Sequence, residues 1–101
     1  ELGVPGTTAP RVYLAHMGES ARLSAVALGA QLREAGVTVV SSTGGKSLKA
    51  QMRHANSLGA QYTIILGEDE VRAGQAVVKS MAENTQESVS RETLADYVLR
   101  G

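Results

Sequence analysis

Short apolar runs alternate with amphipathic stretches along most of the chain. Residues 11–15, 37–41 and 61–67 are continuous runs rich in β-branched or aliphatic side chains, as is typical of strands buried in a parallel sheet. Residues 21–36 and 46–59 lie between these runs, carry apolar side chains at helical spacing and each end on a glycine. The pattern therefore predicts a strand-helix-strand-helix-strand unit with right-handed crossovers.

The pattern changes toward the C-terminus. Residues 68–74 are an acidic stretch that we expect to form a turn, and residues 75–81 and 87–90 are expected to be two short strands. Residues 91–101 predict a closing helix with its N-cap at Ser90. The whole chain is thus expected to form an α/β domain with a mixed sheet of about five strands and a terminal helix.

Helical spacing also predicts which side chains face the core. The expected inner-face residues are Leu23, Val26, Ala27 and Ala30 in the first helix, Leu48, Met52 and Ala55 in the second, and Leu94, Tyr97 and Val98 in the last. Residues 1–10 are rich in Gly, Pro and Thr without periodicity, and the first residue is not Met. We therefore expect a linker over 1–10, cut from a longer protein, and one folded domain over 11–101.

Composition and charge exclude several classes of function. The 101 residues are 43% hydrophobic and 20% charged, with no cysteine and a net charge of zero. The missing cysteines exclude disulfides and thiolate chemistry and are compatible with the cytoplasm. No apolar run reaches the roughly 18 residues that a membrane span needs. Zero net charge argues against a globally basic nucleic-acid binder, but residues 35–67 contain three bases and no acid.

Those three bases lie on one face of the second predicted helix. Lys46, Lys49 and Arg53 are spaced i, i+3 and i+7, and Asn56 extends the row. One interpretation is a solvated helix surface. The other is an anion-binding ridge that tracks a phosphate backbone, with the Gly44-Gly45 turn and the helix amides at one end.

Other site chemistries fit the sequence poorly. The glycine turn lacks the first glycine of a Walker loop, because Val40 occupies that position. His16 and His54 have no second ligand at metal spacing, and no G-x-S-x-G nucleophile elbow occurs. The acids at 68–70 are candidates for general acids or magnesium ligands, but solvated turn acids are the simpler interpretation.

Ligands of open α/β sheets gather beyond the carboxyl ends of the parallel strands. In this chain those ends are residues 16–18, 41–45 and 67–70. They bring a histidine, the glycine turn with its lysines, and an acidic group to one edge. This mixture suits hydrogen bonding to splayed bases beside a phosphate path better than it suits hydrolysis.

The stretch GGKSLKAQMRHANSLGAQYTIILGEDEV, followed by AG and VVK, resembles the C-terminal anticodon-binding domain of bacterial histidyl-tRNA synthetases. That family has Gly-Arg-Ser-Leu-Lys-x-Gln-Met, then Gly-Ala, a strand, Gly-Glu-x-Glu and a Val-x-x-Lys strand. The likeness runs from Arg11 to about Leu99. Two departures stand out: Lys46 replaces the usual arginine, and Ser41-Ser42 stands where an acid commonly precedes the glycine turn.

The resemblance implies a fold, partners and a location. It implies a three-layer, five-stranded mixed sheet with flanking helices, as in the related class IIa synthetases, that receives the anticodon stem-loop of histidine tRNA. It further implies a catalytic domain in the same chain, upstream, that joins histidine to tRNA with ATP and magnesium, in a cytoplasmic homodimer that binds no membrane. This fragment itself is expected to be non-catalytic, without cofactor or metal.

The resemblance also implies which residues contact tRNA. The positions expected to contact the tRNA backbone are Gly44, Gly45, Lys46, Ser47, Lys49 and Arg53. The positions expected to contact anticodon bases are Glu70, Gln75 and Lys79. A second hypothesis is an interaction or regulatory module of a synthetase-like protein that no longer charges tRNA. The third, a small-molecule hydrolase, lacks a nucleophile.

Overall fold

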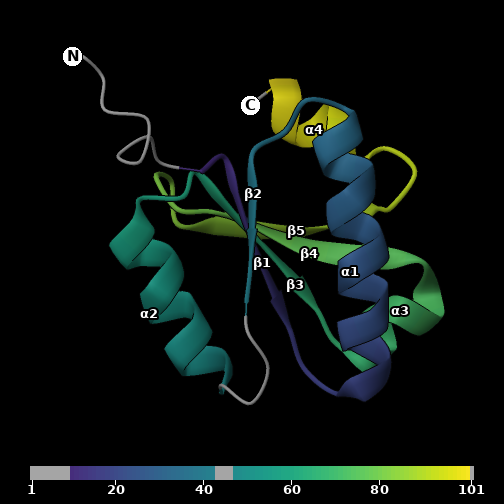
Figure 1. Ribbon diagram of the computed structural model, residues 1–101. Coiled ribbons are helices and arrows are strands. Elements are labelled where there is room, and N and C mark those ends of the chain that lie inside the picture. The colour runs from purple at the N-terminus through teal and green to yellow at the C-terminus, as the bar shows by residue number, and fades with distance from the viewer. Residues whose placement is uncertain (1–9, 43–46, 101) are drawn as a thin grey trace.

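The computed structural model describes residues 10–42 and 47–100 (Figure 1). In chain order the elements are β1 (Val12–His16), α1 (Glu19–Glu34), β2 (Val39–Ser41), α2 (Leu48–Leu58), β3 (Tyr62–Leu66), α3 (Glu68–Ala73), β4 (Gln75–Ser80), β5 (Thr85–Ser90) and α4 (Leu94–Arg100). The described helices include none that is long and apolar enough to cross a membrane.

The strands form one mixed sheet in the order β2-β1-β3-β4-β5. The strand β1 runs parallel to both neighbours, and its Val12 pairs with Val39 on one side and Tyr62 on the other. The later strands β4 and β5 are antiparallel, with Ile64 opposite Val78. The predicted strand-helix-strand-helix-strand unit and the five-stranded mixed sheet are therefore confirmed.

Helices cover the sheet from both sides and give three layers (Figure 1). One face packs against α1, α3 and α4 and contains the main core, whose largest fully buried side chains are Leu14, Leu28, Leu32, Ile64, Leu66, Leu94, Val12, Val78 and Val98. The other face packs against α2 around a smaller cluster of Tyr13, Ala15, Ala55 and Ala60. The separation follows from strand alternation, because Tyr13 and Ala15 point away from the face of Val12 and Leu14.

The predicted inner face of the first helix is wrong. All four residues assigned to it are exposed, and Leu23 and Val26 keep 63% and 65% of their surface accessible. The buried residues of α1 are Ala21, Ala25, Leu28, Gly29 and Leu32. Small side chains let this stripe approach the sheet, since a Cβ added at Gly29 would lie 3.5 Å from Leu14 Cδ2.

The acidic stretch and the start of the last helix also differ from expectation. The acidic stretch after β3 is a short helix, α3, not a turn, because the Glu70 carboxylate accepts a hydrogen bond from the Gly67 amide at 2.7 Å. The last helix, α4, begins at Leu94, so Ser90 does not cap it directly. Its hydroxyl instead accepts a hydrogen bond from the Glu92 amide, within the turn that precedes α4.

Candidate nucleic-acid interface

The helix α2 is the element that carries the predicted basic row. It begins after Ser47, whose hydroxyl accepts a hydrogen bond from the Ala50 amide at 3.2 Å, and it ends at Gly59 in the left-handed conformation. Of its predicted inner stripe, Ala55 is fully buried and Leu48 and Met52 are half-buried. Ser47 is therefore already engaged as the N-cap, although its side chain is exposed.

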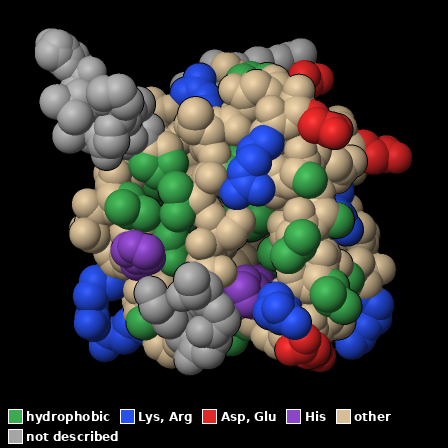
Figure 2. All heavy atoms as spheres, viewed as in Figure 1, with side chains coloured by type: hydrophobic (Ala, Val, Ile, Leu, Met, Phe, Trp, Pro, Cys, Tyr) green, Lys and Arg blue, Asp and Glu red, His purple; other side chains and the backbone are tan. Residues whose placement is uncertain are grey.

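The basic side chains of α2 point away from the sheet. Lys49 and Arg53 are exposed, as is Asn56, and neither base forms an ion pair within residues 10–42 and 47–100. The acidic side chains that are visible in Figure 2 lie in the right half of the view, away from α2 on the left. The two positive charges are thus not neutralised by described acids, whereas Gly44, Gly45 and Lys46 lie outside the described residues.

A buried glutamine fixes α2 at the end of the central strand. Gln51 keeps only 1% of its surface accessible; its Nε2 donates to the His16 carbonyl and its Oε1 accepts from the His16 amide, both at 2.9 Å. The side chain thereby satisfies both backbone groups where β1 ends. This holds the start of α2 beside the carboxyl ends of the parallel strands.

Gln51 was missed because an isolated glutamine in a helix is usually a surface residue. The available signal was its position, since it falls on the same helical stripe as Leu48, Ala55 and Leu58. A polar residue within a buried stripe needs hydrogen-bond partners inside the protein.

The two histidines are placed differently. His54 Nδ1 lies 3.0 Å from the Tyr13 hydroxyl, and the two rings meet edge to face at 5.2 Å. His16 Nδ1 is buried and has no hydrogen-bond partner in the described part of the chain. No group of three or more potential metal ligands occurs among the described residues.

The strand ends meet at one edge of the sheet, as parallel strands must. The Met17 amide donates to the Leu66 carbonyl and the Ser42 amide to the Leu14 carbonyl, each at 2.9 Å. A Cβ added at Gly18 would lie 2.8 Å from Glu68 Oε2, so the turn after β1 and the start of α3 are in contact.

The three residues expected at anticodon bases do not share one surface. Gln75 and Lys79 alternate with the buried Ala76 and Val78, so they face the α2 side of the sheet. Gln75 is exposed and Lys79 half-buried. Glu70 instead belongs to α3, which packs on the opposite side, and its carboxylate caps that helix.

The α2 side of the sheet remains open over its antiparallel half. Among the described helices only α2 covers this side, and it packs on β1 (Figure 1). Gln86 and Ser88 lie opposite Lys79 and Val77 on the neighbouring strand and are exposed. We call Lys49, Arg53, Gln75, Lys79, Gln86 and Ser88 together the α2-side surface. It contains three bases and no acid, and it offers amide and hydroxyl groups for hydrogen bonding.

Gln86 and Ser88 were not among the site residues predicted from the sequence. The signal was strand alternation in residues 85–90, where Val89 is the only apolar residue and the only buried one. Since Val89 faces the main core, positions 86, 88 and 90 must face the other side.

Glu70→Ala is expected to lower the free energy of unfolding by about 0.5–2 kcal/mol, the usual cost of losing a helix-capping side chain. Glu70→Gln retains an oxygen that can accept from the Gly67 amide, so its loss should be smaller. Urea denaturation of both variants measures the difference. Equal stability of Glu70→Ala and the unmodified chain would contradict the capping role.

Comparison with known proteins identifies the class. Residues 11–100 match the family described as Anticodon binding domain, and the chain belongs to this family. The histidine-tRNA ligase of Dehalococcoides mccartyi is 44% identical over 89% of this chain and 22% of that protein. The histidine-tRNA ligase of Symbiobacterium thermophilum is 44% identical over 98% of this chain and 23% of that protein.

Solved structures agree with the sequence relatives. The apo histidyl-tRNA synthetase of S. aureus has a TM-score of 0.84 and 28% identity to this chain, covering 97% of it and 28% of that chain. The resemblance to histidyl-tRNA synthetases and the α/β fold that it implied are confirmed. The chain spans about a fifth of the length of these curated relatives.

Proposed function

We propose that this chain binds the anticodon stem-loop of histidine tRNA through its α2-side surface, as the anticodon-binding part of a histidine-tRNA ligase. The observation that carries the proposal is the basic face of α2, where Lys49 and Arg53 are exposed without ion pairs in the described structure. Exposed bases free of acids attract phosphates, and they lie on the open side of the sheet.

We assign contacts with the tRNA backbone and contacts with the anticodon bases to different elements of the domain. Lys46, Lys49 and Arg53, together with Gly44, Gly45 and Ser47, contact tRNA phosphates. Gln75 and Lys79 contact anticodon bases, because their polar side chains lie on the open half of the sheet. Glu70 Oε1 accepts from the Gly67 amide, and the remaining lone pairs of the carboxylate are available for a contact with an anticodon base.

The attachment of histidine to tRNA requires the longer protein of which this chain is a part. We propose that its other segments form the catalytic domain that joins histidine to tRNA with ATP and magnesium, and that it acts as a homodimer in the cytoplasm. The chain described here matches the anticodon-binding family and only about a fifth of each ligase. Its own contribution is to position the anticodon, without a bound cofactor or metal.

Titrating the isotope-labelled chain with a histidine anticodon stem-loop RNA tests this proposal. Amide signals of α2 and β4 are expected to shift, with Lys49, Arg53, Gln75 and Lys79 among them. Signals of the exposed side of α1, on the far side of the sheet, are expected to stay unchanged. Shifts concentrated on α1 or α4 would place the RNA on the wrong side of the sheet and refute the assignment.

A further inference from the structure

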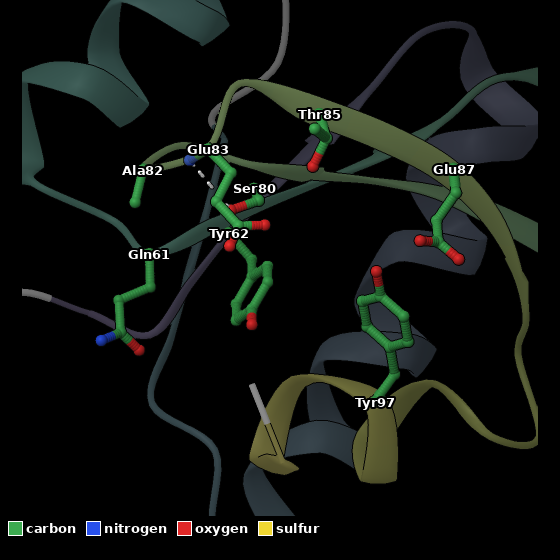
Figure 3. Close-up of a pocket in the computed structure, with 8 residues that line it drawn as sticks. All are labelled: Gln61, Tyr62, Ser80, Ala82, Glu83, Thr85, Glu87 and Tyr97. Carbon is green, nitrogen blue, oxygen red and sulfur yellow. Dashed lines mark hydrogen bonds between the residues drawn. The ribbon is translucent and has the colours of Figure 1, made fainter.

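A separate pocket lies on the side of the sheet opposite α2. Its volume is about 350 Å³, at the lower end of typical small-molecule sites. It opens where β3, β4, β5 and α4 meet, and the residues that give it its chemistry are Tyr62, Ser80, Glu83, Thr85, Glu87 and Tyr97 (Figure 3). None of these residues belongs to the proposed tRNA surface.

Two tyrosines supply the aromatic wall of the pocket. Tyr62 extends from β3 toward α4, and Tyr97 extends from α4 toward β5 (Figure 3). Their ring centroids are 6.2 Å apart and the planes meet at 65°. Both side chains are half-buried, so part of each ring is available to a ligand. Aromatic faces carry partial negative charge and attract cations.

Two glutamates add full negative charge. Glu83 and Glu87 are exposed, line the pocket, and form no ion pair with any described residue. The Glu87 carboxylate lies on the side of the pocket toward which the Tyr97 hydroxyl points (Figure 3). The pKa of Tyr97 is raised, chiefly by the neighbouring Glu87 carboxylate and then by burial. Tyr97 therefore stays neutral near pH 7, and the pocket charge comes from the glutamates.

Arg11, which reaches the pocket lining through Gln61, is already engaged in hydrogen bonds. Gln61, which also lines the pocket, accepts a hydrogen bond from the Arg11 guanidinium, and the same group donates to the Leu99 carbonyl at 3.4 Å. Arg11 is not among the lining residues. The lining thus contains two acids and no base.

We propose that this pocket binds an alkylammonium or guanidinium group. A cation in the pocket is attracted by the tyrosine rings and by the two carboxylates, whereas a phosphate is repelled by both glutamates. The group comes either from a lysine or arginine side chain of a polypeptide or from a free polyamine. This site is independent of tRNA binding, which uses the opposite side of the sheet.

Titration of the isotope-labelled chain with three cations tests the proposal: N-acetyl-arginine amide, N-acetyl-lysine amide and spermidine. At least one is expected to give saturable shifts at Tyr62, Tyr97 and Glu87, and the neutral N-acetyl-norleucine amide is expected to give none. If an amino-acid amide binds more tightly, the proposal is supported and the natural ligand is a polypeptide side chain. If spermidine binds more tightly, the proposal is supported and the natural ligand is a free polyamine. No saturable shift with any cation would overturn it.

Charge variants distinguish cation binding in the pocket from nonspecific attraction of cations to the protein surface. Glu83→Gln combined with Glu87→Gln is expected to weaken cation binding about fivefold or more, because both variants keep size and lose charge. The matched control, Glu34→Gln with Glu92→Gln, changes the net charge equally at exposed acids outside the pocket and should leave the affinity unchanged. Equal weakening by both pairs would overturn the assignment.

Aromatic variants test the contribution of the rings. Tyr97→Phe keeps the ring and is expected to bind within about twofold of the unmodified chain, whereas Tyr97→Leu is expected to bind about two- to fivefold more weakly. Thermal unfolding confirms that each variant is folded before titration. Unchanged affinity in a folded Tyr97→Leu variant would contradict the aromatic part of the site.

Discussion

Replacing Lys49 and Arg53 together by Gln is expected to weaken histidine tRNA binding about 25- to 60-fold at 0.1 M salt. Each phosphate contact contributes roughly 0.7–0.9 to the slope of log affinity against log salt, so the slope should fall by about 1.4–1.8. Adding Lys46→Gln should bring the total decrease to about two to three units. Filter binding over a series of salt concentrations measures both quantities.

The fold should tolerate these changes. Lys49 and Arg53 are exposed and unpaired within the described residues, and such substitutions usually change the free energy of unfolding by less than about 0.5 kcal/mol. Arg22→Gln with Arg72→Gln is a matched control, because it removes the same charge from α1 and α3, on the other side of the sheet. A normally folded Lys49/Arg53 variant with an unchanged salt slope would show that this helix face is merely solvated.

Leu28→Ala is expected to lower the free energy of unfolding by about 2–5 kcal/mol. Leu28 keeps 1% of its surface accessible and packs in the main core, so truncation removes buried methyl groups and leaves a cavity. Leu23→Ala, on the same helix, should change stability by less than about 0.5 kcal/mol because Leu23 is 63% exposed. Urea denaturation followed by circular dichroism compares the two.

These paired leucine variants decide which stripe of α1 faces the sheet. The chemical change is identical, so helix propensity cancels in the comparison and burial alone distinguishes them. A larger loss for Leu23→Ala than for Leu28→Ala would restore the inner face that periodicity first predicted and contradict the observed packing.

The succession of strands and helices along the chain was predictable, and the inner face of α1 was not. Continuous apolar runs such as Tyr62–Leu66 admit few interpretations, since a parallel sheet covered on both faces demands apolar residues throughout. The sequence of α1 instead has two apolar stripes on opposite sides, and spacing is satisfied by either. Close packing decides between the stripes. The small residues Ala21, Ala25 and Gly29 fit against the sheet, which leaves the opposite stripe exposed.

The short helix α3 escaped prediction for a related reason. Its N-cap is Gly67, which has no side chain to mark a helix start, and the cap comes from Glu70 reaching back to the Gly67 amide. A helix of 6 residues also shows too little periodicity to be distinguished from a turn.

The positions of candidate site residues could be predicted from the sequence wherever helix or strand geometry alone determines them. Helical spacing was enough to place Lys49 and Arg53 on the exposed face of α2, and strand alternation places Gln75 and Lys79 on the same side of the sheet. The two hydrogen bonds between the Gln51 side chain and the His16 backbone join residues 35 positions apart. They depend on tertiary packing, which local sequence patterns do not reveal.

The most direct test of the proposed function compares two tRNAs that differ only at the anticodon. Filter binding of this chain to histidine tRNA and to the same tRNA with an exchanged anticodon isolates base recognition, since the phosphate contacts are common to both. We expect the exchanged tRNA to bind at least about fivefold more weakly, because losing one good base contact costs about 1–3 kcal/mol. Equal affinity for the two tRNAs would contradict anticodon recognition by this domain.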